Sequence, residues 1–172
     1  EKVAGTKAGE RLKADGAQHA LCVIHEQGNS SQEARCAGVK DGMDGGKVEI
    51  LYVNGKDLTA AQSTINAKLA QDKSIDWVMA LQASVAMRST DAVAEAGAQA
   101  KVSTFDTNAE LVDAIADGTV QWAVDQQPYM QGYLAVDALW LAHRNGSTLG
   151  GGRPVYTGPS FVCLLYTSPS PR

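Results

Sequence analysis

The chain has 172 residues, of which 44% are hydrophobic and 20% are charged, and its formal net charge is -4. This composition is typical of a folded globular protein and argues against a disordered chain, and no apolar run approaches the roughly 20 residues needed to cross a bilayer. Because Lys and Arg form no cluster, the sequence also argues against nucleic acid as a partner.

Hydrophobic periodicity and turn residues predict helices that alternate with short apolar strands, which is the pattern of a parallel sheet built from crossover units. We expect helices near residues 3–14, 30–43, 59–70, 84–96, 109–116 and 128–143. Strands are expected over residues 20–24, 48–53, 77–80, 101–105 and 120–124, and one more is expected to begin at Val155 and Tyr156. Ser30, with Glu33 three residues later, predicts a capping box at the start of the second helix.

Polar side chains follow every predicted strand. In open parallel sheets, ligands bind in the crevice outside the carboxyl ends of the strands. The polar residues after the strands are His25, Glu26, Gln27, Asn29 and Arg35; Asn54, Lys56 and Asp57; Gln82; Asp106 and Asn108; and Asp125, Gln126 and Gln127. This mixture of donors and acceptors suits a ligand with many hydroxyl groups. Solvent exposure and helix capping explain polar loops equally well, so the pattern alone leaves both explanations open.

Three short segments resemble the ribose and galactose class of substrate-binding proteins of ABC transporters. They are Asp125-Gln-Gln-Pro-Tyr-Met-Gln-Gly-Tyr-Leu-Ala-Val136, Phe105-Asp106, and Asn29 through Arg35-Cys-Ala-Gly38, and residues 157–162 are similar to the last segment of the C-terminal lobe of that family. The resemblance implies the type I periplasmic binding protein fold, an α/β Rossmann-like three-layer sandwich with a parallel sheet. On this basis residues 1–126 are the C-terminal sugar-binding lobe, residues 127–151 cross to an N-terminal lobe, and residues 152–162 return.

The resemblance also implies ligand contacts for Arg35, Gln82, Asp106 and Gln126, although Gln82 departs from the Asn that is more usual in the family. His25 and Asn29 are further candidates for ligand binding. The implied protein binds a monosaccharide or polyol between its two lobes and presents it to a membrane permease. It is expected to be a monomer in the periplasm, or outside the cell on a lipid anchor, and to have no catalytic residue, metal or cofactor.

Several alternatives remain open at this level. The effector-sensing domain of a LacI-type transcription repressor shares this fold and pocket. An α/β enzyme is disfavoured because no glycine-rich dinucleotide loop, phosphate loop or nucleophile elbow is present. Arg35 has Glu33 and Asp41 as alternative surface partners, Asp106 is placed where an N-cap is common, Gln126 fits a solvated loop, and Asn29 fits either a pocket or a turn.

The two ends and the cysteines give further expectations. Residues 163–172 look like translated adapter sequence and are expected to lie outside the fold, and the start at Glu1 is expected to be a truncation. Cys22 falls in a predicted strand and Cys36 in the helix beside it. A disulfide and a pair of buried thiols are both compatible with this placement.

Overall fold

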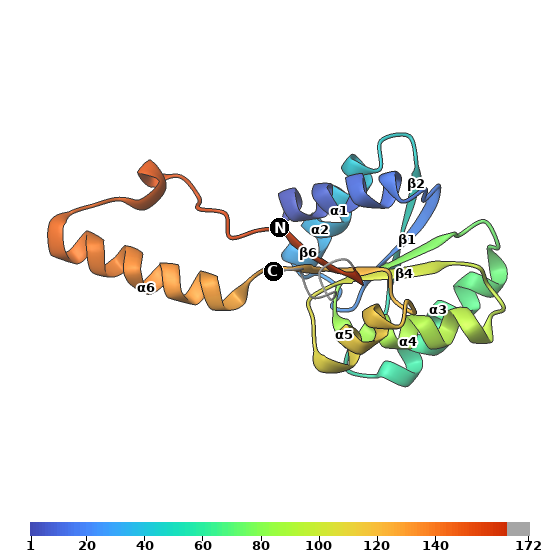
Figure 1. Cartoon of the computed structure of the whole chain (residues 1–172). Coiled ribbons are helices and arrows are strands. Elements are labelled where there is room, and N and C mark those ends of the chain that lie inside the picture. The colour runs from blue at the N-terminus through green and yellow to red at the C-terminus, as the bar shows by residue number, and fades with distance from the viewer. Residues whose placement is uncertain (165–172) are drawn as a thin grey trace, which may run out of the picture.

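A six-stranded sheet with helices on both faces forms the centre of the computed structural model, which describes residues 1–164 (Figure 1). The strands are β1 His19–Ile24, β2 Lys47–Tyr52, β3 Trp77–Ala80, β4 Lys101–Phe105, β5 Trp122–Asp125 and β6 Ser160–Cys163. They lie in the order β2-β1-β3-β4-β5-β6, and every neighbouring pair is parallel except β5 and β6, which are antiparallel. The predicted α/β sandwich with a parallel sheet is confirmed, and the sheet carries one antiparallel strand, β6, at its edge.

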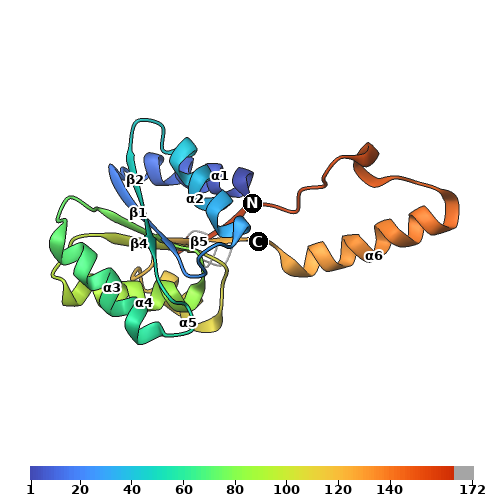
Figure 2. The same ribbon diagram turned by 180° about the vertical axis from the view of Figure 1, so that it is seen from behind.

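Five helices cover the two faces of this sheet. One face carries α1 Lys2–Ala14 and α2 Ser30–Gly42, and the other carries α3 Leu58–Gln71, α4 Ala83–Glu95 and α5 Ala109–Ala116 (Figures 1 and 2). β1, β3 and β4 are buried along nearly their whole length, as expected for strands covered on both sides. Alternate side chains along these strands therefore enter two separate apolar cores, one on each face.

The start of α2 differs from the prediction. The cap is Asn29, whose Oδ1 accepts hydrogen bonds from the backbone N–H groups of Ser31 at 3.0 Å and Gln32 at 3.3 Å. The predicted cap at Ser30 is wrong, because Ser30 is already the first helical residue. Gly28 turns the chain with a positive φ of 83°, and this turn leaves Asn29 with the extended backbone that an N-cap requires.

Four glycines let α1 and α2 touch backbone to backbone. Gly5 and Gly9 lie one turn apart on α1, and Gly38 and Gly42 lie one turn apart on α2. A Cβ added at any of these positions would lie 2.1–2.2 Å from a carbonyl oxygen of the facing helix. Since real Cβ atoms essentially never approach so closely, each of the four positions requires a glycine at this helix separation.

A disulfide joins Cys22 of β1 to Cys36 of α2, with the two Cα atoms 5.9 Å apart. Both residues are fully buried. The bridge therefore ties the helix that carries Arg35 to a central strand of the sheet, and it decides the alternative that the sequence left open.

The chain leaves the sheet after β5 and returns to it at β6. It leaves through α6 Pro128–Asn145, which projects from the sheet and has no buried residue, and comes back through a short 3-10 turn, η1 Leu149–Gly152 (Figures 1 and 2). The strand predicted at Val155 and Tyr156 is wrong, because both residues are exposed and lie in an irregular segment, and the strand begins only at Ser160. Within residues 1–164, no helix is both long enough and apolar enough to span a bilayer.

Cys163 corrects the predicted end of the fold. It is buried, closes β6 and pairs with Trp122 of β5, so it belongs to the sheet and not to the segment predicted to lie outside the fold. The antiparallel pairing explains this, because β6 needs an apolar residue opposite the buried Trp122. Residues 165–172 of the predicted segment lie outside the described residues.

Replacing Gly9 with Ala is expected to lower the free energy of unfolding by about 2 kcal/mol or more, because the new Cβ would meet the carbonyl oxygen of Val39 at 2.2 Å. Urea denaturation measures this loss. Gly132→Ala in α6 is the matched control, since nothing lies within 4 Å of the added Cβ, and it is not expected to destabilise the sheet. Equal effects of the two substitutions would contradict the helix contact.

Alkylation of the unfolded, unreduced chain is expected to modify Cys163 alone, because Cys22 and Cys36 are bonded to each other. Reduction before alkylation should expose all three thiols to the reagent, and mass spectrometry distinguishes the products. Opening this bridge is expected to lower the free energy of unfolding by about 3 kcal/mol. Three modified cysteines without a reductant would show that the bridge is absent.

Candidate functional site

Three predicted site residues come together at the carboxyl edge of the sheet. Arg35 lies in the second turn of α2, Asp106 directly follows β4, and Gln126 directly follows β5. Because β1, β4 and β5 are parallel members of one sheet, the segments that follow them meet at the same edge. The fold thus assembles one site from residues far apart in sequence.

These three side chains form a continuous hydrogen-bonded chain. Arg35 Nη2 donates to Gln126 Oε1 at 2.9 Å, and Gln126 Nε2 donates to Asp106 Oδ1. A guanidinium only donates and a carboxylate only accepts, so the amide between them is held in one orientation. These three side chains would present hydrogen-bond donors to a ligand at the Arg35 end and acceptors at the Asp106 end.

The surface partners considered for Arg35 are engaged elsewhere. Asp41 forms an ion pair with Lys2 at 2.8 Å, and Glu33 accepts a hydrogen bond from the hydroxyl of Tyr52 at 3.3 Å. Arg35 itself is 9% exposed, so it is not a surface side chain. Its guanidinium therefore lies at the carboxyl edge of the sheet, beside Gln126.

Two further contacts fix the guanidinium in place. Arg35 Nε donates to Glu1 Oε2 at 2.5 Å, and its Cζ lies 4.8 Å from the ring centroid of Phe105. The hydrogen bond from Arg35 lowers the pKa of the Glu1 carboxyl, and partial burial of that carboxyl opposes the shift. Glu1 was not predicted from the sequence, because its position depends on the close approach of α1 to α2. The only signal was the glycine spacing on the two helices.

The carboxylate of Asp106 is not used as a helix cap. Asn108 caps α5 instead, since its Oδ1 accepts from the backbone N–H of Leu111 at 2.8 Å. Asp106 has a positive φ of 63°, which is uncommon outside glycine, and its N–H donates to the carbonyl of Val124 at 2.9 Å. The backbone is thus held in an unusual conformation while the side chain binds Gln126.

The other three candidates are placed differently. Asn29 Oδ1 caps α2, and Asn29 Nδ2 donates to Glu26 Oε2 at 2.8 Å, so the side chain stabilises the turn that leads into the helix. His25 is half-buried in the same loop, where its ring contacts Gln32. Gln82 is the exposed N-cap residue of α4, and its side chain makes no capping hydrogen bond. The structure does not join Gln82 to the Arg35, Gln126 and Asp106 chain.

Two crossing segments, residues 126–127 and 157–159, lie side by side where the chain leaves and re-enters the sheet. The carbonyl of Gln126 accepts from Gln131 Nε2 at 2.6 Å and from Thr157 Oγ1 at 3.3 Å. Gln127, with a positive φ of 54°, donates through its side-chain amide to the carbonyl of Thr157. Gln126 therefore contributes its side chain to the polar chain and its backbone to the crossing.

An open apolar groove of about 650 Å³ adjoins this site. It runs between α6 and the returning segment, where Leu134, Leu139 and Val155 contribute to its walls. Glu1 and Gln126 also line it. The polar chain thus borders a surface on which α6 presents apolar side chains without a partner inside residues 1–164.

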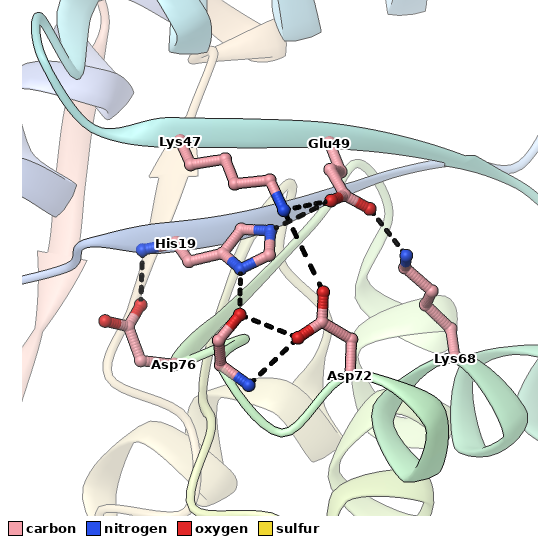
Figure 3. A network of polar contacts seen from close by, with 7 residues as sticks. His19, Lys47, Glu49, Lys68, Asp72 and Asp76 are labelled. Carbon is pink, nitrogen blue, oxygen red and sulfur yellow. Dashed lines mark hydrogen bonds and ion pairs between the residues drawn. The ribbon is translucent and has the colours of Figure 1, made fainter.

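A separate polar cluster connects the start of β1 and β2 with the end of α3 (Figure 3). Within residues 1–164, His19, Glu49 and Asp72 are close enough to hold a metal ion, with their ligand atoms all within 4.8 Å of one another. Lys47 Nζ lies between the two carboxylates, 2.5 Å from Glu49 Oε1 and 3.9 Å from Asp72 Oδ2. Lys68 Nζ lies 2.5 Å from Glu49 Oε2. Because two ammonium groups already compensate the carboxylates, we interpret the cluster as an ion-pair network that fastens α3 to the sheet.

Comparison with known proteins identifies the family. Residues 1–147 match the family model described as periplasmic binding protein domain. The chain belongs to the periplasmic binding protein family. No curated protein sequence matches it.

Solved structures of a carbohydrate transporter and of two solute binding proteins are similar to the chain along most of its length. A carbohydrate transporter from Acidothermus cellulolyticus, in complex with myo-inositol, is 48% identical with a TM-score of 0.87, and the match covers 95% of this chain and 57% of that one. An arabinose binding protein from Geobacillus stearothermophilus is 23% identical with a TM-score of 0.77, covering 95% and 61%. A solute binding protein from Actinobacillus succinogenes, with bound D-allose, is 20% identical with a TM-score of 0.76, covering 95% and 59%. The last two likenesses show the fold, and the chain spans about three fifths of the length of each structure.

Glu49 makes the ion-pair network sensitive to acid, because hydrogen bonds from Lys47 and Lys68 lower the pKa of its carboxyl from 4.5 to about 2. A depressed carboxyl pKa stabilises the folded state above the ordinary value, and this contribution is lost as the pH falls towards about 2. Glu49→Gln should therefore reduce the loss of stability between about pH 5 and about pH 2.5, measured by urea unfolding. Glu110→Gln, in the exposed first turn of α5, is expected to keep the wild-type pH dependence. Wild-type pH dependence in both variants would contradict the role of Glu49 in the acid sensitivity of the network.

Proposed function

We propose that this chain is part of the sugar-binding component of an ABC-type importer, which captures a monosaccharide or polyol between two lobes without chemical conversion. The observation that carries the proposal is the chain of Arg35, Gln126 and Asp106 at the carboxyl edge of the sheet. Membership of the periplasmic binding protein family supports it, as does the 48% identity to a carbohydrate transporter that holds myo-inositol.

The free hydrogen-bonding capacity of the site suits hydroxyl groups. Arg35 has five N–H donors, and within residues 1–164 one is used by Glu1 and one by Gln126, which leaves 5 − 2 = 3. Asp106 accepts from Gln126 through Oδ1, and no residue of the described chain donates to its Oδ2. Each hydroxyl of a polyol both donates and accepts, so neighbouring hydroxyls can satisfy Arg35 and Asp106 together. A ligand without hydroxyls would leave the remaining Arg35 donors and Asp106 Oδ2 without hydrogen-bond partners.

The remaining surface supports a second lobe outside these residues. On this proposal residues 1–126 form the C-terminal lobe, residues 127–151 cross to an N-terminal lobe, and residues 152–162 return. Large apolar side chains are exposed along α6, with Tyr129 at 85%, Leu139 at 72% and Trp140 at 60%. Such a patch is typical of a surface that another structural element covers. The N-terminal lobe would supply that cover and the other half of the ligand site.

The wider setting follows from the same proposal. The binding protein works as a monomer in the periplasm or outside the cell, where it delivers its ligand to a membrane permease. His25 belongs to the polar rim of the site, and Gln82 follows β3 at the same edge of the sheet. Asn29 acts through the turn that leads into α2.

Arg35→Lys in the full-length protein is expected to weaken binding of myo-inositol or D-allose about 100-fold, because Lys keeps the charge and loses the planar donor fork. Isothermal titration calorimetry measures the affinity, and the melting temperature reports whether the variant is folded. Arg88→Lys is the matched control, since within residues 1–164 Arg88 pairs only with Asp91 on the surface of α4. Unchanged affinity in folded Arg35→Lys would overturn the role of Arg35.

A further inference from the structure

His25 and Gln32 form a side-chain pair at the start of α2, ten residues or fewer from Arg35 in the sequence. Gln32 Oε1 accepts hydrogen bonds from the backbone N–H groups of His25 at 3.0 Å and Glu26 at 3.3 Å. Only the carbonyl oxygen of an amide can accept from an N–H group, so these two bonds determine which way the Gln32 amide faces. Its Nε2 is thereby directed at His25 Nε2, 3.0 Å away.

This orientation determines the tautomer of His25. An amide NH₂ group only donates, so the ring Nε2 must accept with a free lone pair. The proton of the neutral ring is then on Nδ1. Protonating the ring would place an Nε2–H group against the NH₂ of Gln32, with two donors 3.0 Å apart. Turning the amide to relieve this contact would break the bonds from the backbone of His25 and Glu26.

The surroundings of the ring also oppose its charged form. Nδ1 is buried and has no hydrogen-bond partner among residues 1–164, and an unpaired buried donor costs more when it carries charge. Burial lowers the pKa of His25, and the positive charge of Arg35 on α2 lowers it further. Glu26 in the same loop and Asp106 after β4 raise it, without reversing the shift. The loop after β2 approaches the ring through Gly55, which brings no charge.

We propose that His25 and Gln32 are positioning residues of the polyol site, and that they hold the loop before α2 in place only while His25 is neutral. Gln32 ties residues 25 and 26 to the first turn of α2, and Arg35 follows one turn later on the same helix. Acidification breaks these hydrogen bonds and shifts the first turn of α2, whose position determines where the Arg35 guanidinium lies. Ligand affinity should therefore fall as the pH falls below the ordinary pKa of histidine. The ligand in this inference rests on the proposed function, whereas the tautomer does not.

The tautomer can be tested on this chain without a ligand. Long-range ¹H–¹⁵N correlation spectra distinguish a protonated ring nitrogen from an unprotonated one, and the His25→Asn variant assigns the His25 signals. We expect a protonated Nδ1 and an unprotonated Nε2 at neutral pH, and a midpoint of titration below the ordinary value of about 6.5. His19 and His143 in the same spectra serve as internal comparisons. An Nε2–H tautomer would overturn the inference.

Gln32→Glu is the decisive variant, because a carboxylate can still accept from the two backbone N–H groups and can also accept from a protonated Nε2. It is expected to raise the pKa of His25. In the full-length protein, wild-type affinity for myo-inositol should fall about tenfold between pH 7.5 and pH 5.0, as expected for the loss of roughly one hydrogen bond. Gln32→Glu should lose most of this pH dependence.

A wild-type affinity that is constant over this pH range, or a Gln32→Glu variant with the wild-type dependence, would overturn the positioning role. If no polyol binds at any pH while the spectra show the Nδ1–H tautomer, the proposed function fails and the assignment of the tautomer stands. The two failures are therefore distinguishable.

Discussion

The contact between α1 and α2 is the constraint on which the rest of this site depends. Four glycines remove the side chains that would hold the two helix backbones apart, and the disulfide then anchors α2 to β1. This combination determines how far Arg35 stands from the sheet and brings Glu1 within reach of it. A buried guanidinium needs such a frame, because an unpaired charge in this position would be costly.

Arg35 also connects three segments that are far apart in the sequence. It meets a carboxylate from the start of α1, a ring from the end of β4 and an amide from the crossing after β5. Each partner satisfies a different property of the guanidinium, namely its charge, its flat face and its fork of donors. Lys would satisfy the charge alone, which is why the geometry favours Arg at this position.

Much of the fold could be predicted from the sequence, because apolar strands alternate regularly with helical periodicity and each strand is followed by a turn. Arg35, Asp106 and Gln126 could be predicted as neighbours for a related reason, since each follows a parallel strand. The cap at Asn29 was missed because Ser30 and Glu33 match a capping box equally well, and only the turn at Gly28 decides between them. Glu1 and the pairing of Cys163 depend on tertiary packing, which local patterns do not report. The His25 tautomer requires knowledge of where an amide oxygen points.

The side chain and the backbone carbonyl of Gln126 make different contacts. Its side chain lies between Arg35 and Asp106, while its carbonyl is held by Gln131 and Thr157 at the place where the chain crosses out of the sheet and back. The connection from β5 to α6 runs through this peptide, so a displacement of α6 relative to the sheet would act on the amide that joins Arg35 and Asp106. The position of α6 and the geometry of the Arg35, Gln126 and Asp106 side chains are therefore coupled through one residue.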